Sequence, residues 1–415
     1  MQTIKKNRKQ PELRFKEFDN SLNINSYERY SFEDIFSFST GKNIKQNEAS
    51  PKFKTPCVRY GELYHMYQEV IYSIFNKTDL PESELLFSKG DEILLPSAGE
   101  EPIGIGAASA LPFKNVAIGR TINILRPKKK ETYSQFYVSY YINEKLKKDI
   151  ARLAKGVSIS NVYNSDLKKL SITLPNLDEQ KKVAEFLSSV DKKIQQLTKK
   201  KELLEDYKKG IMQKIFSQEI RFKDDYGDNY PNWKKRKLNE VGEIICGKTP
   251  RTNDKSLWGG HIQFITPTDI TDCDKYQNNV KRFVTENSKI KVLPINTIVY
   301  TCVASIGKIS ITSKPAITNQ QINAIVTSDD YYYQLIYYVL VYITPRIKSM
   351  KSTTTLPIIN KTEFSNIIIN IPEDIDEQKK IGEFLSSIDK KIDCVSVQID
   401  KTREFKKGLL QQMFV

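Results

Sequence analysis

The sequence predicts an α+β protein in which two mixed α/β domains, in a pseudo-twofold arrangement, are joined by two long antiparallel coiled-coil helices. Three observations support this fold class. A segment of forty residues occurs twice, both copies have a heptad pattern of apolar residues, and each copy follows a globular segment of similar length. At 415 residues the chain also exceeds the usual size of one domain. We therefore expect four parts: a first domain at 1–176, a first helix at 177–217, a second domain at 218–375 and a second helix at 376–415.

The duplication is clearest in the two long repeats, residues 178–217 and 376–415. They begin DEQKKVAEFLSSVDKKI and DEQKKIGEFLSSIDKKI, and 19 of their 40 positions are identical without a gap. Weaker matches lie at similar offsets in the rest of each half, among them LRFK at residue 13 with IRFK at residue 220, and the Gly-Lys pairs at residues 41 and 247. The order along the chain is therefore domain, helix, domain, helix.

Each repeat has the heptad spacing of a coiled-coil seam. Eight of ten seam positions are apolar in each copy, and the exceptions are Lys201, Lys208, Thr402 and Lys406. Heptads alone favour a homodimeric coiled coil, but the duplication favours pairing of the two helices within one chain. Some residues of the repeats are expected to pack the helices together and to dock a partner subunit, with internal packing alone as the alternative. They are Gln180, Phe186, Leu187, Ile194, Gln378, Phe384, Leu385 and Ile392.

Short alternating apolar runs, broken by Pro, Gly and Asn, predict strands in both halves, at residues 91–95, 121–125, 297–300 and 367–371. Helices are expected at residues 134–153 and 331–350. The second helix contains the apolar run 335–343, which we expect Pro345 to end. This run is shorter than the roughly 20 residues that cross a membrane. Each half is therefore expected to fold as a mixed α and β domain.

The basic composition indicates a polyanionic partner. Lys and Arg number 65 against 50 Asp and Glu, which gives a formal charge of +15 and a pI near 9.2. Nucleic acid is the leading candidate, and an anionic membrane surface is the second. No apolar run reaches a spanning length. Because the basic N-terminus has no apolar segment behind it, no secretory signal is expected and the protein is expected in the cytoplasm.

Five cysteines and two histidines are scattered along the chain without paired spacing. Disulfide frameworks and structural zinc sites both need clustered ligands. We therefore expect neither kind of site, and we expect the cysteines to be reduced and structural. A metal ion bound by this chain is not expected.

One segment matches a nucleotide-binding motif. GEIICGKT, from Gly242 to Thr249, fits the phosphate-loop pattern G-x-x-x-x-G-K-[ST] in full. A nucleotide site also needs a buried strand before the loop and a helix that opens at Gly247. The flanking segments, KKRKLNEV and PRTNDKSLWGG, are a poor strand and a poor helix. A P-loop ATPase is therefore kept only as an alternative function, and a structural coiled-coil protein with a basic surface is another.

Short motifs in both halves carry a family resemblance. The second half has GKTP at residue 247, WGG at 258, FITPTDI at 264, IVYTCVASIGKI at 298, ITNQQINAI at 317, STTTLPI at 352 and IPEDIDEQKKIGEFLSSIDKKI at 371. The first half has TGKNI at residue 40, VRYGELY at 58, ILLPSAGEEPIGIG at 93 and LPNLDEQKKVAEFLSSVDKKI at 174, and it lacks the WGG and TNQ elements. With these motifs the chain resembles, over essentially its whole length, the specificity subunits of type I restriction-modification systems.

The resemblance implies a target-recognition domain in each half, and paired helices that act as a spacer and dock two methyltransferase subunits. It also implies double-stranded DNA as the ligand, restriction (translocase) subunits as further partners, and adenine methylation within a split, asymmetric target. S-adenosylmethionine, ATP and magnesium would belong to the partner subunits, and this chain would bind none of them. The sequence contains no Pro-Pro dipeptide, hence no Asn-Pro-Pro-aromatic loop of the kind that adenine methyltransferases use. The chain itself is therefore expected to be non-catalytic and to make no membrane contact.

Residue type and position indicate which side chains could contact DNA. Lys and Arg meet phosphates, whereas Asn, Gln, Arg and Lys can pair with base edges. In the first half the candidates are Lys42, Asn43, Lys45, Arg59, Tyr60, Ser97, Glu100 and Arg120. In the second half they are Lys248, Thr249, Arg251, Thr266, Thr268, Asp269, Ser305, Lys308, Asn319, Gln320 and Gln321. For each, a solvated charge or a loop-closing side chain is the alternative, and the KKRK run at 234–237 beside Trp233 is either a phosphate-contacting patch or a solvated edge.

Overall fold

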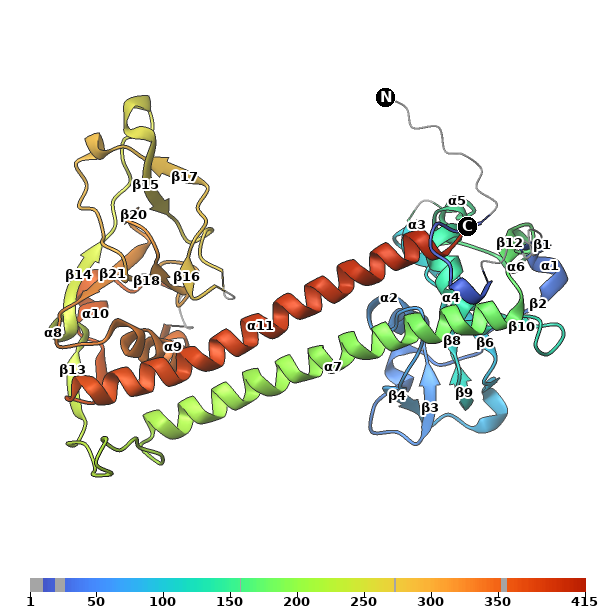
Figure 1. Cartoon of the computed structure of the whole chain (residues 1–415), viewed down its shortest axis with the longest axis horizontal. Coiled ribbons are helices and arrows are strands. Elements are labelled where there is room, and N and C mark those ends of the chain that lie inside the picture. The colour runs from blue at the N-terminus through green and yellow to red at the C-terminus, as the bar shows by residue number, and fades with distance from the viewer. Residues whose placement is uncertain (1–9, 19–26, 157, 272–273, 352–356) are drawn as a thin grey trace. The chain divides into compact units, whose positions relative to one another are not determined.

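The computed structural model describes residues 10–18, 27–156, 158–271, 274–351 and 357–415 (Figure 1). Cys273 and residues 352–356 of the STTTLPI motif lie outside the described residues. The chain forms two compact units: unit 1 is Met1–Leu197 with Val397–Val415, and unit 2 is Thr198–Ser396. Each unit therefore contains one globular half of the sequence, the first part of one long helix and the last part of the other.

In unit 1 the strands form two four-stranded sheets, in the orders β2-β10-β6-β8 and β4-β3-β9-β5, and two short pairs. The strands are β1 (Glu28–Ser31), β2 (Phe36–Thr40), β3 (Thr55–Val58), β4 (Asn76–Thr78), β5 (Phe87–Lys89), β6 (Glu92–Pro96), β7 (Ala98–Gly99), β8 (Ser109–Leu111), β9 (Lys114–Ile118), β10 (Ile122–Pro127), β11 (Ser160–Asn161) and β12 (Ser171–Leu174). The helices are α1 (Phe32–Ile35), α2 (Tyr60–His65), α3 (Pro102–Ile105), α4 (Gln135–Tyr141), α5 (Lys147–Arg152), α6 (Asn164–Leu167) and the long α7 (Leu177–Phe216). A π-helical turn (Ile142–Leu146) joins α4 to α5.

In unit 2 a five-stranded sheet has the order β14-β21-β18-β19-β16 and a three-stranded sheet the order β17-β15-β20. The strands are β13 (Lys234–Lys237), β14 (Gly242–Cys246), β15 (Trp258–Ile265), β16 (Tyr276–Gln277), β17 (Arg282–Val284), β18 (Ile298–Thr301), β19 (Ile309–Thr312), β20 (Ala316–Thr318), β21 (Ile322–Thr327) and β22 (Ile368–Ile371). The helices are α8 (Leu238–Val241), α9 (Tyr333–Lys351), α10 (Lys361–Ser365) and the long α11 (Ile375–Met413), and a 3-10 turn η5 (Lys255–Leu257) precedes β15.

The two units repeat one strand plan. The antiparallel order β2-β10-β6-β8 corresponds to β14-β21-β18-β19, and the pair β1-β12 corresponds to β13-β22. In each second sheet two strands run parallel, β3 with β9 and β15 with β20. The strand runs expected from the sequence fall in β6, β10, β18 and β22, and the expected helices in α4–α5 and α9. These predictions are confirmed.

The long helices supply part of the core of both units. One core cluster of unit 1 contains apolar residues from the start of α7 and the end of α11. One core cluster of unit 2 contains residues from the start of α11 and the end of α7. Within each unit the start of one long helix thus packs beside the end of the other. The helices run antiparallel there, as the heptads and the duplication predict.

Each long helix begins at a side-chain cap. The Asn176 carboxamide oxygen accepts a hydrogen bond from the backbone N–H of Glu179 (2.9 Å). The Asp374 carboxylate accepts from the backbone N–H groups of Asp376 (2.8 Å) and Glu377 (3.2 Å). These caps satisfy N–H groups that the first helical turn leaves without an intrahelical partner.

Pro345 does not end α9, contrary to the prediction from the sequence, and the helix continues to Lys351. A proline inside a helix removes one intrahelical hydrogen bond. Leu340 and Ile347 nevertheless lie on the buried face before and after it, and the Thr344 hydroxyl donates to the Leu340 carbonyl (2.6 Å). Burial of this face outweighs the lost bond, so the helix extends. Among the residues described, α9 included, no helix is long and apolar enough to cross a membrane.

Candidate nucleic-acid interface

In unit 2 many of the candidate residues gather where the parallel strands β15 and β20 end. The backbone N–H of Asn319 donates to the Ile265 carbonyl (3.2 Å) and joins the two strand ends. Thr266 follows on one side of this bond. On the other side the Gln320 carboxamide oxygen accepts from the Thr249 hydroxyl (2.8 Å). Hydroxyl and amide groups that can pair with base edges therefore meet at one place. We call this place, formed by Thr249, Thr266, Asn319 and Gln320, the unit 2 corner.

The loop after β15 is held in shape by Asp269. One oxygen of its carboxylate accepts from the N–H and the hydroxyl of Thr266 (2.9 and 2.6 Å). The other oxygen accepts from the backbone N–H of Lys281 (3.2 Å). The hydroxyls of Thr266 and Thr268 lie 3.0 Å apart. Asp269 therefore orders the loop that presents the two threonines at the unit 2 corner.

Unit 1 repeats this corner with different side chains. The Gly119 N–H donates to the Val58 carbonyl (2.8 Å) and joins the ends of β9 and β3. The backbone N–H of Arg120 donates to the Asn43 carbonyl (2.9 Å), which adds the segment after β2. The candidates at or directly beside this unit 1 corner are Lys42, Asn43, Arg59, Tyr60, Ser97 and Arg120. The backbone plan is shared, but the residues after the paired strands differ: unit 1 has Arg59 after β3 and Arg120 after β9, whereas unit 2 has Thr266 after β15 and Gln320 after β20.

A glycine is required at each corner because two backbones approach closely. A Cβ at Gly41 would lie 1.8 Å from the Gly119 carbonyl oxygen. A Cβ at Gly247 would lie 2.2 Å from the Asn319 carbonyl oxygen. The repeated Gly-Lys pairs mark this approach, and Lys42 and Lys248 are exposed directly beside it.

The GEIICGKT segment does not have the structure of a phosphate-binding loop. Its first five residues form strand β14, which pairs antiparallel with β21. No helix opens at Gly247, and the next helical turn is η5, eight residues later. The strand, loop and helix that the motif needs are therefore not formed by this segment, and the ATPase alternative is not favoured.

Several candidates lie outside the two corners or have other partners. The Lys308 ammonium donates to the carbonyls of Pro267 (3.3 Å) and Ile270 (3.2 Å), and so closes the loop after β15. Lys45 lies 3.9 Å from the Glu48 carboxylate. The remaining members of the set are exposed in loops (Glu100, Arg251, Ser305) or half-buried beside the unit 2 corner (Gln321). Contact with DNA stays a prediction for every candidate.

The KKRK run forms the short strand β13. Lys234 and Arg236 both pair with the Glu373 carboxylate, at 2.6 and 2.9 Å. The adjacent Trp233 is buried and donates from its indole nitrogen to Glu377 (3.1 Å). Two of the four cations therefore share one carboxylate of the same unit, which favours the solvated-edge interpretation of this run.

The repeated LRFK and IRFK segments clamp the first turn of each long helix. Arg14 binds both carboxylate oxygens of Glu179 (2.7 Å each), and Arg221 binds Glu377 (2.9 to 3.2 Å). Both carboxylates are buried, so each depends on its guanidinium partner. Sequence reasoning noted these tetrapeptides only as repeats. The duplication of both the tetrapeptide and the DEQ triplet, with similar separations in the two halves, was the signal that could have identified the clamps.

The eight helix residues chosen for packing and docking make contacts inside the units. The side chains of Gln180 and Gln378 accept from the backbone N–H groups of Ser134 (2.9 Å) and Tyr332 (2.8 Å). Phe186 and Phe384 meet Phe15 and Phe222 edge to face, at centroid distances of 5.7 and 5.6 Å. Leu187 and Leu385 are fully buried, and Ile194 and Ile392 are half-buried. A docking role for these eight residues stays a prediction.

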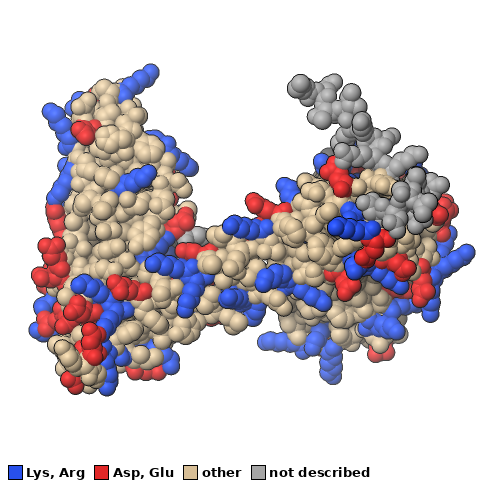
Figure 2. Space-filling view, viewed as in Figure 1, with Lys and Arg blue, Asp and Glu red and all other residues tan. Residues whose placement is uncertain are grey.

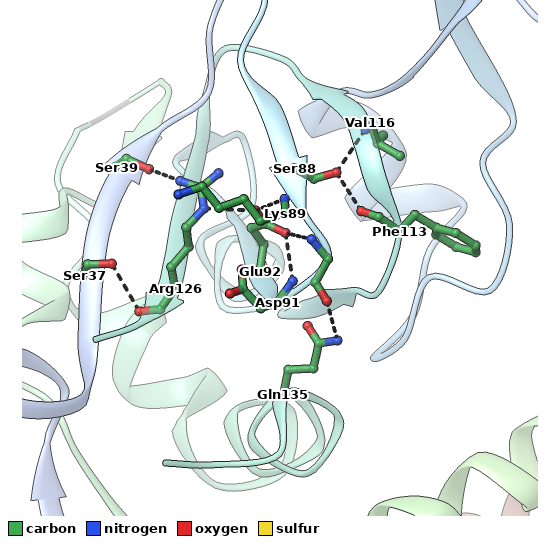
Figure 3. Close-up of polar contacts among 11 residues, drawn as sticks. Ser37, Ser39, Ser88, Lys89, Asp91, Glu92, Phe113, Val116, Arg126 and Gln135 are labelled. Atoms are coloured by element: carbon green, nitrogen blue, oxygen red, sulfur yellow. Dashed lines mark hydrogen bonds and ion pairs between the residues drawn. The ribbon is translucent and has the colours of Figure 1, made fainter. Parts of the chain in front are cut away.

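A dense polar cluster in unit 1 surrounds the Glu92 carboxylate (Figure 3). This carboxylate is fully buried and accepts from the backbone N–H groups of Lys89, Gly90 and Asp91, at 2.6 to 3.1 Å. It also accepts from the Arg126 guanidinium (2.9 Å). The cluster ties the turn between β5 and β6 to β10. With its hydrogen bonds made inside the unit, it is a structural anchor.

Two buried thiols are not poised as nucleophiles. Burial raises the pKa of Cys57 and of Cys302 to about 12, so both are protonated at neutral pH. Within the described ranges, no group of three or more His, Cys, Asp or Glu residues is arranged to hold a metal ion. The two corners offer hydrogen bonding and positive charge, which are the means of nucleic-acid binding.

Comparison with known proteins identifies the family. Residues 25–206 and 230–402 match the family described as type I restriction modification DNA specificity domain. The type I restriction enzyme MjaIX specificity subunit of Methanocaldococcus jannaschii is 29% identical over 208 residues, which span 48% of this chain and about half, 48%, of that relative. The putative MjaX specificity subunit of the same organism is 26% identical over 341 residues, or 77% of this chain and 76% of that relative.

The fold has a solved counterpart. The crystal structure of the S subunit of a type I restriction-modification system from M. genitalium matches with a TM-score of 0.65 at 19% identity, over 98% of this chain and 99% of that one. At this identity the likeness supports the fold, and the family follows from the two matched regions, which together cover most of the chain. This chain belongs to the family of type I restriction-modification DNA specificity domains, in the form of a duplicated specificity subunit.

Proposed function

We propose that this chain is the non-catalytic subunit that reads a bipartite, asymmetric DNA target for a type I restriction-modification complex. The observation that carries the proposal is the corner found in both units, with one backbone plan and different side chains. Thr249, Asn319 and Gln320 present hydroxyls and amides in unit 2. In unit 1, Arg120 presents an exposed guanidinium group, and that of Arg59 is half-buried and paired with Glu62 (2.9 Å). Because different donors and acceptors select different bases, two unlike corners fit two unlike half-sites.

The cations beside the corners supply the affinity that is independent of sequence. Lys42 and Arg120 are exposed at the unit 1 corner, and Lys248 and Arg251 are exposed at or near the unit 2 corner. Contacts between such side chains and phosphates position a protein on the duplex without reading it. The formal charge of +15 supports the same role.

Chemistry belongs to partner subunits in this proposal. Two methyltransferase subunits methylate adenine, restriction (translocase) subunits cut unmodified DNA, and the complex works in the cytoplasm. S-adenosylmethionine, ATP and magnesium are bound by these partners. Family membership supports this division of labour, and so does the use of the Glu92 carboxylate and the buried thiols inside the fold.

The outer surfaces of the long helices offer two equivalent docking patches. Tyr207 and Phe405 occupy the same position of the two repeats, and their side chains are 53% and 55% exposed. One turn later, Gly210 and Gly408 are also equivalent, and nothing lies within 4 Å of where a Cβ would stand. A glycine inside a helix costs about 1 kcal/mol relative to alanine, and packing within this chain does not require it here. Two equivalent patches, each with an exposed aromatic ring one turn before a glycine, fit two copies of one partner subunit.

The docking patches are tested by counting bound methyltransferase subunits with native mass spectrometry. Tyr207→Ser or Gly210→Leu is expected to remove one copy, and either change combined with Phe405→Ser to remove both. Lys209→Ser, at an exposed neighbouring position, is the control and is expected to retain two copies. Retention of two copies by the double variants contradicts the assignment of these patches.

The proposed function is tested by the methylated motif. The chain is co-expressed with its methyltransferase subunit in a host that lacks adenine methylation, and modified adenines are mapped by single-molecule sequencing. One motif is expected, with two defined parts separated by unread base pairs, and it is expected to vanish when the chain is omitted. A continuous motif, or methylation that does not depend on the chain, contradicts the proposal.

A further inference from the structure

Unit 2 has a surface groove at its WGG motif, and the first half of the sequence lacks this motif. The groove has a volume of about 480 Å³ and lies between η5, the start of β15 and β17. Its lining residues are Thr252, Lys255, Trp258, Gly259, Gly260, Lys281, Arg282 and Phe283. In Figure 2 the part of unit 2 that carries β15 and β17 shows mainly Lys and Arg among its charged side chains, whereas acidic side chains gather near β13.

The WGG motif builds the groove through a β-bulge. Trp258 and Ile262 both stand opposite Val284 of β17, so the strand accommodates extra residues between them. Gly259 has a φ of +84°, and a Cβ at Gly260 would lie 2.4 Å from the Val284 carbonyl oxygen. Both glycines are therefore needed for this shape, which turns the Trp258 side chain toward β17.

The bulge places Arg282 against two aromatic rings and gives it no acidic partner among the residues that the structure describes. The Arg282 guanidinium lies 5.0 Å from the ring centroid of Trp258 and 4.9 Å from that of Phe264. The two rings meet edge to face at 5.2 Å, and the Trp258 indole nitrogen donates to the Arg251 carbonyl (3.1 Å). Stacking holds the plane of a guanidinium and leaves its N–H groups available to an anion.

The cations of the groove have no acidic partner in the described part of the chain. Lys255, Lys281 and Arg282 are exposed, and no carboxylate of a described residue forms an ion pair with any of them. By contrast, Lys234 and Arg236 of the same unit are paired with Glu373. Three unpaired cations around one groove favour a ligand with negative charge.

The groove adjoins the unit 2 corner. The backbone N–H of Lys281 donates to Asp269, the same carboxylate that orders Thr266. The carbonyl that accepts from Trp258 belongs to Arg251, two residues after Thr249. The groove and the unit 2 corner are therefore held together by shared hydrogen bonds in one part of unit 2.

We propose that the WGG groove binds a phosphate of the DNA backbone beside the half-site that unit 2 reads, with Arg282, Lys281 and Lys255 as its ligands. This inference rests on the proposed function and adds a positioning site to it. Apart from the three cations, the polar side chains of the lining are Thr252 and Trp258, and the Trp258 indole N–H already donates to the Arg251 carbonyl, so the described lining has no amide that could pair with adenine. Unit 1 has no WGG motif, and the added anchoring is specific to unit 2.

The test compares Arg282→Gln and Lys281→Gln with the wild-type chain in the complete complex. Lys281→Gln removes only an exposed ammonium and keeps the backbone N–H that binds Asp269, so it remains informative if Arg282→Gln disturbs the bulge. Affinity is measured over a range of salt concentrations, on the cognate duplex and on one with a scrambled unit 2 half-site. Lys148→Gln, an exposed lysine of α5, is the control for loss of one charge.

Each groove variant is expected to weaken binding to both duplexes by the same factor. The slope of log affinity against log salt is expected to fall by about 0.9 for each lost phosphate contact, while the methylated motif stays the same. An affinity and slope equal to those of Lys148→Gln would overturn the proposal. A changed motif, or a loss confined to the cognate duplex, would overturn it in favour of base reading. Failure of the proposed function is distinguished by the wild-type complex, which would then yield no split motif.

Discussion

In each unit the long helices pack against the domain at a junction of four polar side chains. Three of these side chains, a tyrosine, an aspartate and a lysine, are equivalent in the two units, and the fourth differs. In unit 1, the Tyr140 hydroxyl donates to Asp191 of α7 (2.5 Å), and Lys406 of α11 contacts the same carboxylate (2.8 Å). In unit 2, the equivalent residues make the same contacts: Tyr338 donates to Asp389 of α11, and Lys208 of α7 lies 2.5 Å from it. Lys208 and Lys406, which stand at the same seam position of the two repeats, thus each meet an aspartate of the other long helix.

The fourth residue comes from the domain and has opposite charge in the two units. In unit 1, the Glu69 carboxylate accepts from Lys406 (2.8 Å). In unit 2, the Lys275 ammonium donates to the hydroxyls of Tyr338 (2.9 Å) and Ser386 (3.0 Å). In the unit 1 junction two carboxylates therefore contact one ammonium, whereas the unit 2 junction adds a second ammonium, Lys275, beside Lys208 and Asp389. The lysine-aspartate contact between the long helices is thus the same in both units, whereas the charge that the domain adds beside it differs.

The pKa values of the two lysines shift in opposite directions. Burial opposes the charge of Lys406, but Glu69 and Asp191 outweigh it and raise the lysine pKa. Burial lowers the pKa of Lys275 to about 8, and Asp389 offsets only part of that effect. The junctions are therefore expected to respond differently to loss of a lysine and to pH.

The largest effect is expected at the unit 1 junction. Lys406→Met leaves two carboxylates, the buried Asp191 and the half-buried Glu69, without the cation that they share. Removal of one partner from such a cluster costs about 3 to 5 kcal/mol in the free energy of unfolding. Denaturant titration of the full chain measures the loss, with Lys407→Met on the exposed face as the control. Equal stability of the two variants would show that the cluster contributes nothing.

A smaller effect is expected from the equivalent change in unit 2. Lys208→Met leaves Asp389, whose side chain is 16% exposed, with the Tyr338 hydroxyl as a donor and Lys275 nearby. The expected loss is about 2 kcal/mol, the contribution of one hydrogen bond to a charged group. The same titration with Lys209→Met as control gives the comparison. If Lys208→Met destabilises the chain more than Lys406→Met, the fourth residue does not have the role assigned to it.

A pH dependence is expected from unit 2. Unfolded Lys275 keeps its ordinary pKa of 10.5, so between about pH 8 and 10.5 the unfolded chain binds a proton that the folded chain has lost. Stability contributed by this residue therefore rises with pH across that window. The groups that face it are Tyr276, Tyr337, Tyr338, Lys208, Lys390, Asp389 and Asp393.

The measurement is the difference in unfolding free energy between the wild-type chain and Lys275→Met, from pH 8 to 10. Groups present in both proteins cancel in this difference, which is expected to move in favour of the wild type as the pH rises. A difference that stays constant, or that moves toward the variant, contradicts the lowered pKa.

The smallest effects are expected where the repeats are alike. Gly210→Ala and Gly408→Ala each place a Cβ in open space within a helix. Each is expected to raise the free energy of unfolding by about 0.5 to 1 kcal/mol, by the same amount in the two helices. Thermal unfolding of the free chain measures the gain. A loss at one position alone would show that the two glycine positions are not equivalent.

The framework of this fold could be predicted from the sequence because it is duplicated. The heptads and the repeat predicted the antiparallel long helices, and the Gly-Lys pairs coincide with the two corners. The role of Lys208 and Lys406 could not be predicted, since their aspartates lie on the other helix and meet them only after the helices pack. Pro345 was misjudged because the apolar face that carries the helix through it is a property of the core.

The candidate interface was only partly predictable for the same reason. Lys308 was selected as a DNA contact by residue type, yet its ammonium turns inward to carbonyls of the loop after β15. Arg282 was not among the predicted DNA contacts, because its position beside Trp258 and Phe264 depends on a β-bulge between β15 and β17, which lie apart in the sequence. Residue type gives the chemistry of a surface, but the partners of each side chain are set by tertiary packing.

The central claim is that each unit reads its own half of the target. The most direct test replaces residues 220–372 with the corresponding segment of a relative of different specificity and maps the methylated motif of the resulting complex. The account predicts that one half of the motif changes to that of the relative while the other half stays as it was. A change in both halves, or in neither, would contradict it.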